Sequence, residues 1–119
     1  MKRGEVWTVS GTTDYAGKPR PVVIVQDDCF SETESLTICL VTSIDTYAPF
    51  IRIAIEPSES NGLRLPSRLM TDKIATVPKS KLGKKIGRLS AADMGRMSRS
   101  IITFLGLGEP GPAVLETSE

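Results

Sequence analysis

Short apolar runs separated by polar, proline-rich or glycine-rich segments make up most of the chain before residue 78. Residues 5–9, 21–26, 36–43 and 50–55 are rich in β-branched side chains. Such runs are too short for stable helices and are typical of strands. Arg52 is expected on the outer side of its strand. Residues 68–77 predict either two further short strands or one strand that bends around Asp72.

The clearest single element is a helix over residues 91–105. Ser90 is a suitable N-cap, and Gly106 follows the last apolar position. One face repeats apolar residues at helical spacing, namely Met94, Met97, Ile101 and Leu105. A single helical turn is predicted at 79–82. Five or six short strands with one late helix predict a small, mainly β, barrel-like domain with α additions.

The segments between these elements indicate a single domain. Residues 10–19 form a polar loop of ten residues, a length that is often functional or mobile. Asn61 and Gly62 mark a surface turn. Glycines and prolines after residue 107 disfavour regular structure, so we expect a domain over residues 1–107 and a disordered tail over 108–119.

The composition of the 119 residues, 39% hydrophobic and 24% charged, is that of an ordinary globular protein. No run of 18 apolar residues and no signal-peptide pattern occur, so we expect a cytoplasmic protein without a membrane span. The two cysteines, Cys29 and Cys39, are expected to be reduced and partly buried. Without any histidine and without ligand spacing, a zinc site is not expected.

The net charge of +1 conceals an uneven distribution of charges. Residues 64–99 contain two acidic residues and ten basic ones, which are Arg64, Arg68, Lys73, Lys79, Lys81, Lys84, Lys85, Arg88, Arg96 and Arg99. A segment of this kind suggests either an electropositive face for a polyanion or a solvated basic face without a ligand.

Several kinds of catalysis are excluded by the residues present. The absence of histidine rules out serine–histidine and cysteine–histidine pairs. No phosphate-binding glycine-rich motif follows a strand. The adjacent pair Asp27 and Asp28 fits a solvated turn better than a metal site. Arginine, hydroxyl groups and isolated carboxylates remain as candidates.

Arg20 is the first candidate, because Pro19 and Pro21 restrict the backbone on both sides of it. Its planar guanidinium suits a phosphate group, although it could instead pair with Asp27 or Asp28 at the start of a strand.

Thr42 and Ser43 end a predicted strand, where their hydroxyls could cap the backbone or contact a ligand. Asp72 stands among cations and could be either the centre of a structural ion pair or a catalytic carboxylate.

Several short motifs, in this order, resemble the MazF/PemK family of ribonuclease toxins over residues 1–107. They are Lys2-Arg3-Gly4-Glu5-Val6-Trp7, Gly17-x-x-Arg20-Pro21-Val22-Val23-Ile24-Val25-Gln26, Val41-Thr42-Ser43, Leu63-x-x-x-Ser67, Asp72-Lys73-Ile74-x-Thr76-Val77, Lys81-Leu82, Ile86-Gly87-x-Leu89-Ser90 and Leu105-Gly106-Leu107. The resemblance implies an SH3-like β-barrel of the MazF/CcdB type with a C-terminal helix, acting as a homodimer. It also implies cleavage of single-stranded RNA without metal or other cofactor, leaving a 2′,3′-cyclic phosphate and a 5′-hydroxyl. A cognate antitoxin holds such toxins inactive.

The resemblance places the catalytic arginine at Arg20, the catalytic hydroxyl at Thr42 and, from the PemK-like branch, an aspartate at Asp72. Contacts with RNA are expected from Asp14, Lys18, Ser43, Ser67, Arg68, Lys73 and Lys79. The general base stays open between Asp72 and Asp14.

The sequence departs from its relatives at three positions. Asp14 and Met70 stand where the PemK-like branch has a histidine and an arginine, and Ala75 stands where the family usually has arginine. We therefore expect the mechanism of the MazF-like branch, led by Arg20 and Thr42.

Two other functions fit a barrel of this kind. One is a DNA gyrase inhibitor resembling CcdB, although the C-terminal residues lack the Trp-Gly-Ile end of that family. The other is a small SH3-like module that binds RNA without cleaving it. Incubation with a long RNA and mapping of the new 5′ ends separates these functions from the endoribonuclease.

Overall fold

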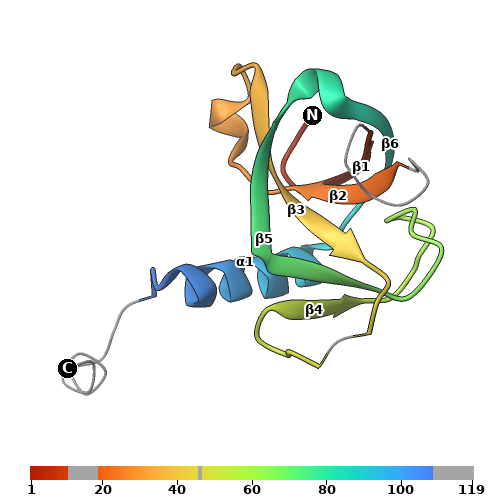
Figure 1. Cartoon of the computed structure of the whole chain (residues 1–119), viewed down its shortest axis with the longest axis vertical. Coiled ribbons are helices and arrows are strands. Elements are labelled where there is room, and N and C mark those ends of the chain that lie inside the picture. Colours follow the sequence, from red (N-terminus) through yellow and green to blue (C-terminus); the bar gives the residue numbers. More distant parts are fainter. Residues whose placement is uncertain (11–18, 46, 109–119) are drawn as a thin grey trace.

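The computed structural model describes residues 1–10, 19–45 and 47–108. One antiparallel sheet has the strand order β4-β5-β3-β2-β1-β6 and curls into a barrel, with a helix across one end (Figure 1). The strands are β1 (Glu5–Val9), β2 (Arg20–Ile24), β3 (Ser35–Thr42), β4 (Arg52–Ile55), β5 (Ser67–Pro78) and β6 (Leu82–Arg88). The helix is α1 (Ala91–Leu105), and the 3-10 turns are η2 (Asp28–Phe30) and η3 (Lys79–Lys81). The predicted small β-barrel with a C-terminal helix is confirmed.

β5 is a single strand that bends in its middle. Cys39 on β3 pairs with Ile74, but the next residue, Leu40, pairs with Met70, so residues 71–73 have no partner on β3. The first half of β5 pairs with β4 on its other side. Of the two alternatives that the sequence left open, the structure shows one strand bent around Asp72.

β6 is the strand that the sequence did not predict. Its sequence, Leu-Gly-Lys-Lys-Ile-Gly-Arg, lacks the alternation of apolar and polar residues that marks a half-buried strand. It is nevertheless paired with β1, from Glu5 opposite Arg88 to Val9 opposite Leu82, with two register shifts between them. β6 is the outermost strand of the sheet, and its conformation depends on its hydrogen bonds with β1 more than on burial of its side chains.

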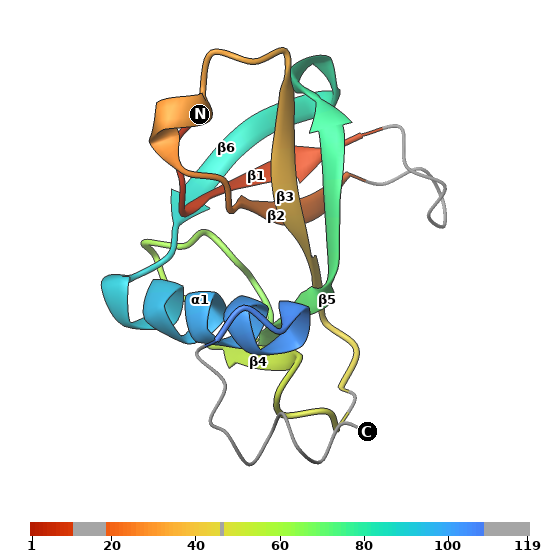
Figure 2. The same ribbon diagram turned by 90° about the vertical axis from the view of Figure 1, so that its left-hand side faces the viewer.

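Both faces of the central strands are buried. One cluster lies on the face of the sheet that α1 covers, and it includes Val23, Val41, Leu69 and Met97. Figure 2 shows α1 crossing the molecule beside β4, below β1, β2 and β6. The second cluster lies on the opposite face and consists of Val9, Val22, Ile24, Leu36 and Ile38. The near-continuous apolar runs of β2 and β3 follow from this two-sided burial.

α1 begins and ends where the sequence predicted. The Ser90 side chain accepts a hydrogen bond from the Asp93 backbone N at 3.1 Å, and Gly106 closes the helix in the left-handed region with φ of 70°. Inside the helix, the buried Ser100 hydroxyl contacts the Thr71 hydroxyl and donates to the Phe50 carbonyl. These bonds join α1 to the bend of β5. No helix in the described ranges is long and apolar enough to cross a membrane.

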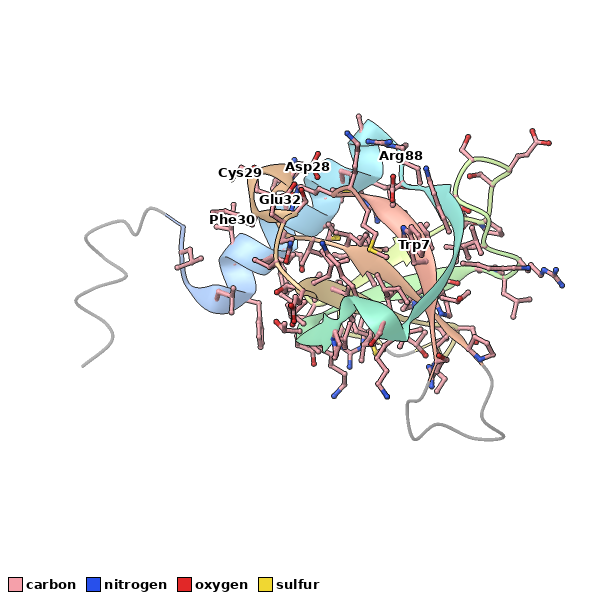
Figure 3. The ribbon with its side chains drawn as sticks, turned by 90° about the horizontal axis from the view of Figure 1, so that it is seen from above. Trp7, Asp28, Cys29, Phe30, Glu32 and Arg88 are labelled. Carbon is pink, nitrogen blue, oxygen red and sulfur yellow. The ribbon has the colours of Figure 1, made fainter. Side chains whose placement is uncertain are left out.

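The cysteines have different environments. Cys39 is buried, and burial raises the pKa of its thiol to about 12. Cys29 is exposed on η2, as Figure 3 shows, so the expectation that both are partly buried is wrong for Cys29. The hydrogen bond with Asp27 raises the pKa of the Cys29 thiol as well. Both thiols are free and protonated at neutral pH, which makes them poor nucleophiles.

Glu5 on β1 is a buried carboxylate that receives several donors. Trp7 Nε1 lies 2.9 Å from Oε1, and the Lys2 backbone N lies 3.1 Å from the same oxygen. Lys85 Nζ lies 3.2 Å from Oε2, which joins β1 to β6. Burial raises the pKa of Glu5, but the hydrogen bonds from Trp7, Lys2 and Lys85 outweigh it and lower the pKa to about 2.

Replacing Glu5 by glutamine is expected to lower the free energy of unfolding at pH 7 by about 2 kcal/mol, because hydrogen bonds to a charged group are lost. The folded pKa lies below the ordinary value of 4.5, so this stabilisation is present above that pH and is lost as the pH falls toward 2. Urea unfolding at pH 7 and pH 2.5 should show the difference between the two proteins shrinking in acid. Glu32→Gln, an exposed control, should change stability by less than about 0.5 kcal/mol. A constant difference across this pH range would contradict the assignment.

Candidate active site

A groove of about 640 Å³ opens where β1, β2 and β3 reach the same end of the barrel. Its described lining is mostly apolar and contains two arginines and no carboxylate. The lining residues are Thr8, Pro19, Arg20, Pro21, Val41, Thr42, Ser43, Gly62, Leu63, Arg64, Leu65, Ser67 and Ile86. The connection between β4 and β5 rises beside the ends of β1 and β2, as Figure 1 shows, and forms one wall.

Arg20 and Thr42 are brought to the groove by the pairing of β2 with β3. Val22 pairs with Leu40, and the same register continued by two residues places Arg20 opposite Thr42. Arg20 also pairs with Val9 on β1, so it starts its strand between two neighbours. The two principal catalytic candidates therefore lie beside one another at the mouth of the groove.

The hydroxyl groups in the groove have defined partners. Thr42 Oγ1 accepts a hydrogen bond from the Ile44 backbone N at 3.1 Å, so the hydroxyl caps the chain after β3. A hydroxyl that accepts one bond still has its own proton to donate. Ser67 Oγ donates to the Leu65 carbonyl at 2.8 Å, and Ser43 is exposed on the lining. Thr42 can therefore cap the backbone and contact a ligand at the same time, so the two roles that the sequence left open are compatible.

The wall formed by residues 62–67 is held by the Asn61 side chain. Asn61 Oδ1 accepts from the backbone N of Ser58 at 3.0 Å and of Leu63 at 2.9 Å, and its Nδ2 donates to the Glu56 carbonyl at 2.9 Å. Asn61 is 3% exposed, so these bonds are sheltered from water. The turn expected at the surface is present, with Ser58, Glu59 and Ser60 exposed, and the buried Asn61 side chain bonds it from within.

Two glycines allow this corner to touch β6. A Cβ on Gly62 would lie 2.0 Å from the Ile86 carbonyl oxygen, and one on Gly87 would lie 2.3 Å from the Asn61 carbonyl carbon. Gly62 also has φ of 73°, which favours glycine. The Arg88 backbone N donates to the Ser60 carbonyl at 2.8 Å. The wall is thus clamped against an edge strand through backbone contact.

Other predicted RNA-contacting residues lie outside the groove lining. Arg68 pairs in register with Thr42, but its guanidinium binds Asp45 at 2.6 Å. Lys73 is exposed at the bend of β5, and Lys79 Nζ donates to the Ser31 carbonyl. Asp14 and Lys18, the remaining two, lie outside the described residues. Ser43 and Ser67 are the predicted RNA contacts that the structure places in the groove.

Asp72 forms an ion pair with Arg52 from β4, and both side chains are mostly buried. Arg52 pairs in register with Met70, the position at which the PemK-like branch has its arginine. The guanidinium beside Asp72 therefore comes from the neighbouring strand. Asp72 is absent from the groove lining. Its ion pair with Arg52 matches the first of the two roles that the sequence left open, the centre of a structural ion pair.

Sequence reasoning gave no site role to several residues of the lining, among them Thr8, Arg64, Leu65 and Ile86. Arg64 was counted only as part of the basic segment, and Leu65 lies in a turn without periodic pattern. Thr8 and Ile86 line the same groove because β1 pairs with β6, and nothing in the local sequence indicates that pairing. The Asn61-Gly62 dipeptide was the one local signal of a constrained wall.

The described residues contain no group of three or more histidine, cysteine, aspartate or glutamate side chains able to hold a metal ion. The groove instead offers a guanidinium and hydroxyls around an apolar surface. This combination can bind a phosphodiester by charge-assisted hydrogen bonds and an unstacked base by apolar contact.

The chain is thus a small, single-sheet β-barrel with a helix across one end and a groove lined by arginines and hydroxyls at the strand ends. The PemK-like, MazF-like toxins of type II toxin–antitoxin systems match residues 2–105. The chain belongs to this family.

Relatives and solved structures agree with this assignment. A probable endoribonuclease MazF of Mycolicibacterium smegmatis is 48% identical over 107 residues, covering 90% of this chain and 98% of the relative. Endoribonuclease MazF9 of Mycobacterium tuberculosis is 27% identical over 117 residues, with 90% and 98% covered. A mycobacterial endoribonuclease solved with its cognate antitoxin is 25% identical, with a TM-score of 0.76 over 92% of this chain and 99% of that one.

Proposed function

We propose that this chain is the endoribonuclease toxin of a type II toxin–antitoxin pair, and that it cleaves single-stranded messenger RNA in the cytoplasm. The observation that carries the proposal is the meeting of Arg20 and Thr42 at the groove of a MazF-family barrel. The 48% identical relative is named as a probable endoribonuclease. Cleavage of messenger RNA would inhibit translation and growth.

The proposed reaction is a transesterification within the RNA. The ribose 2′-oxygen attacks its own 3′-phosphorus, the bond from phosphorus to the 5′-oxygen breaks, and a 2′,3′-cyclic phosphate and a 5′-hydroxyl remain. Negative charge grows on the phosphoryl oxygens, and a guanidinium fixed at the start of β2 stabilises it. In this scheme Arg20 binds those oxygens, and the Thr42 hydroxyl donates to the phosphate or orients the 2′-hydroxyl.

The proton of the 2′-hydroxyl needs an acceptor, and arginine cannot serve at ordinary pH. Of the two carboxylates that the sequence left open, Asp72 is paired with Arg52 outside the groove lining, so we assign this role to Asp14, which lies outside the described residues. Asp72, paired with Arg52, would instead stabilise the bend of β5. The remaining expected RNA contacts, Lys18, Ser43, Ser67, Arg68, Lys73 and Lys79, would bind the strand before and after the cut.

Two protein partners are part of the proposal. A cognate antitoxin would bind this chain, and the similar mycobacterial endoribonuclease solved with its cognate antitoxin supports this. In the proposal the antitoxin occupies the groove in place of RNA. A second copy of the chain would form a homodimer. Exposed apolar side chains support this, including Phe50 at 75% and Phe104 at 47% exposure.

The purified protein is expected to cleave a long single-stranded RNA at a short recurring motif, and to do so equally in EDTA. Sequencing of the products should show 5′-hydroxyl ends, which can be ligated only after phosphorylation. Light scattering of the same preparation should give twice the mass of the chain. Binding without cleavage would contradict the proposal and favour the non-catalytic RNA-binding module.

The gyrase inhibitor resembling CcdB is not favoured by the comparisons, since the curated relatives are named endoribonucleases. In the same experiment it would leave the RNA intact.

A further inference from the structure

One wall of the groove is the segment that connects β4 to β5. It carries two exposed side chains that the proposed mechanism does not use, Arg64 and Leu65. The inference drawn from them rests on the proposed endoribonuclease function and concerns which RNA sequence is cut. Both residues come from the same short segment, whereas Arg20 and Thr42 come from the strand ends. The groove therefore has one side suited to the phosphate and a separate side free for another part of the nucleotide.

This segment is fixed on both sides of the two residues. Before them, the backbone N of Leu63 is bonded to Asn61, and the Leu63 side chain is 9% exposed in the core. After them, Ser67 Oγ holds the Leu65 carbonyl at 2.8 Å. The backbone that carries both side chains is therefore positioned before any ligand binds, which lowers the entropy lost on binding.

The Leu65 side chain is 59% exposed although its backbone is held. A large apolar side chain kept in water beside a groove is a suitable surface for the face of an unstacked base. Single-stranded RNA is recognised through such splayed bases, which contact apolar or planar side chains on their faces and hydrogen-bond donors on their edges.

Arg64 has no hydrogen bond or ion pair with any other described residue, and its side chain is exposed on the groove. Other arginines of the basic segment are engaged, since Arg68 binds Asp45 and Arg96 binds Asp93 and the Ala54 carbonyl. Arginine presents only donors, in a fixed fork. It fits a base edge with two neighbouring acceptors, such as O6 and N7 of guanine, and does not fit the donor-acceptor edge of adenine.

We propose that Arg64 and Leu65 select the base next to the scissile phosphate, with Leu65 against the face of the base and Arg64 on an edge with two acceptors, as in guanine. Arg64 is a specificity-determining residue in this scheme and takes no part in the chemistry. The alternative, a simple contact of Arg64 with a phosphate, needs only its positive charge and would be satisfied by lysine.

The test uses the full chain and RNA oligonucleotides built on the motif found by mapping the 5′ ends. The four bases are placed in turn at each position beside the cut, and kcat/KM is measured for wild type, Arg64→Lys, Arg64→Gln and Leu65→Ala. Wild type should prefer guanine over adenine by about tenfold or more at one of these positions. Arg64→Gln should reduce this preference to about twofold or less. Arg64→Lys should keep part of it, because an ammonium also donates to the two acceptors of guanine. Leu65→Ala should lower kcat/KM for all four bases. Arg99→Lys, an exposed change on α1, should keep the wild-type preference.

An Arg64→Gln variant that lowers kcat/KM equally for all four bases, and so keeps the wild-type preference, would show a phosphate contact and overturn the inference, while leaving the proposed nuclease intact. A wild type without any preference at these positions would overturn it in the same way. A wild type that cleaves no RNA would overturn the proposed function itself, and the inference with it.

Discussion

Arg20→Ala is expected to lower the single-turnover rate of RNA cleavage by about 10²–10³-fold, because the growing charge on the phosphate loses its fixed cation. Arg20→Lys should recover only part of the rate, since lysine keeps the charge and loses the bidentate geometry. The rate should be measured with the enzyme in excess, so that weak RNA binding does not hide the chemical step.

Arg96→Ala is the matched control for this experiment. Its guanidinium binds Asp93 and the Ala54 carbonyl on the helix side of the molecule, outside the groove lining. The control should cleave at the wild-type rate, and near-ultraviolet circular dichroism should show that each variant is folded. An Arg20→Ala protein that cleaves within threefold of wild type would remove Arg20 from the mechanism.

Gly87→Ala is expected to lower stability strongly through crowding of backbone atoms alone, because no positive φ adds to the strain at this position. The added methyl would lie 2.3 Å from the Asn61 carbonyl carbon and 2.4 Å from the Ser60 oxygen, and both are backbone atoms that cannot rotate away. We expect a loss of about 3 kcal/mol in the free energy of unfolding, from overpacking between the wall and β6. Where the variant remains folded, RNA cleavage should fall because the groove wall is displaced.

Gly95→Ala provides the control with the same added atoms. In α1 its new methyl would meet only the flexible end of Arg99, at 3.4 Å. Replacing glycine by alanine within a helix should raise stability by up to about 1 kcal/mol. Urea unfolding of the two variants should therefore move in opposite directions from wild type. A Gly87→Ala protein within about 0.5 kcal/mol of wild type would show that the clamp is not tight.

Local sequence was sufficient for the elements whose residues carry their own signal. The apolar runs of β2 and β3 reflect burial on both faces of these strands, and the capped amphipathic pattern of α1 reflects burial of one helix face. β6 carries no such signal, because it is an edge strand with exposed lysines whose only partner is β1, about 80 residues earlier. Strand pairing over such separations cannot be read from a local pattern.

The residues of the candidate site likewise fall into those that local sequence predicts and those that it does not. Arg20 and Thr42 stand at strand ends, so their positions follow once β2 and β3 pair. The partner of Asp72 could not be predicted, because Arg52 lies on a strand whose register was unknown. Leu65 lies in a segment whose place is set by Asn61 and by contact with β6. Long-range packing, and not local preference, assembles that wall.

The pairing of the first strand with the last has a consequence for how the protein is made. Synthesis delivers β1 first, but its outer edge stays open until β6 emerges, and the Leu89 backbone N then binds the Gly4 carbonyl at 2.9 Å. The corner at Asn61 cannot be clamped before Gly87 exists. Because domains fold as units during synthesis, we expect a nascent chain shorter than this to lack a formed groove. A ribosome-bound fragment would then be unable to cut the message from which it is being translated.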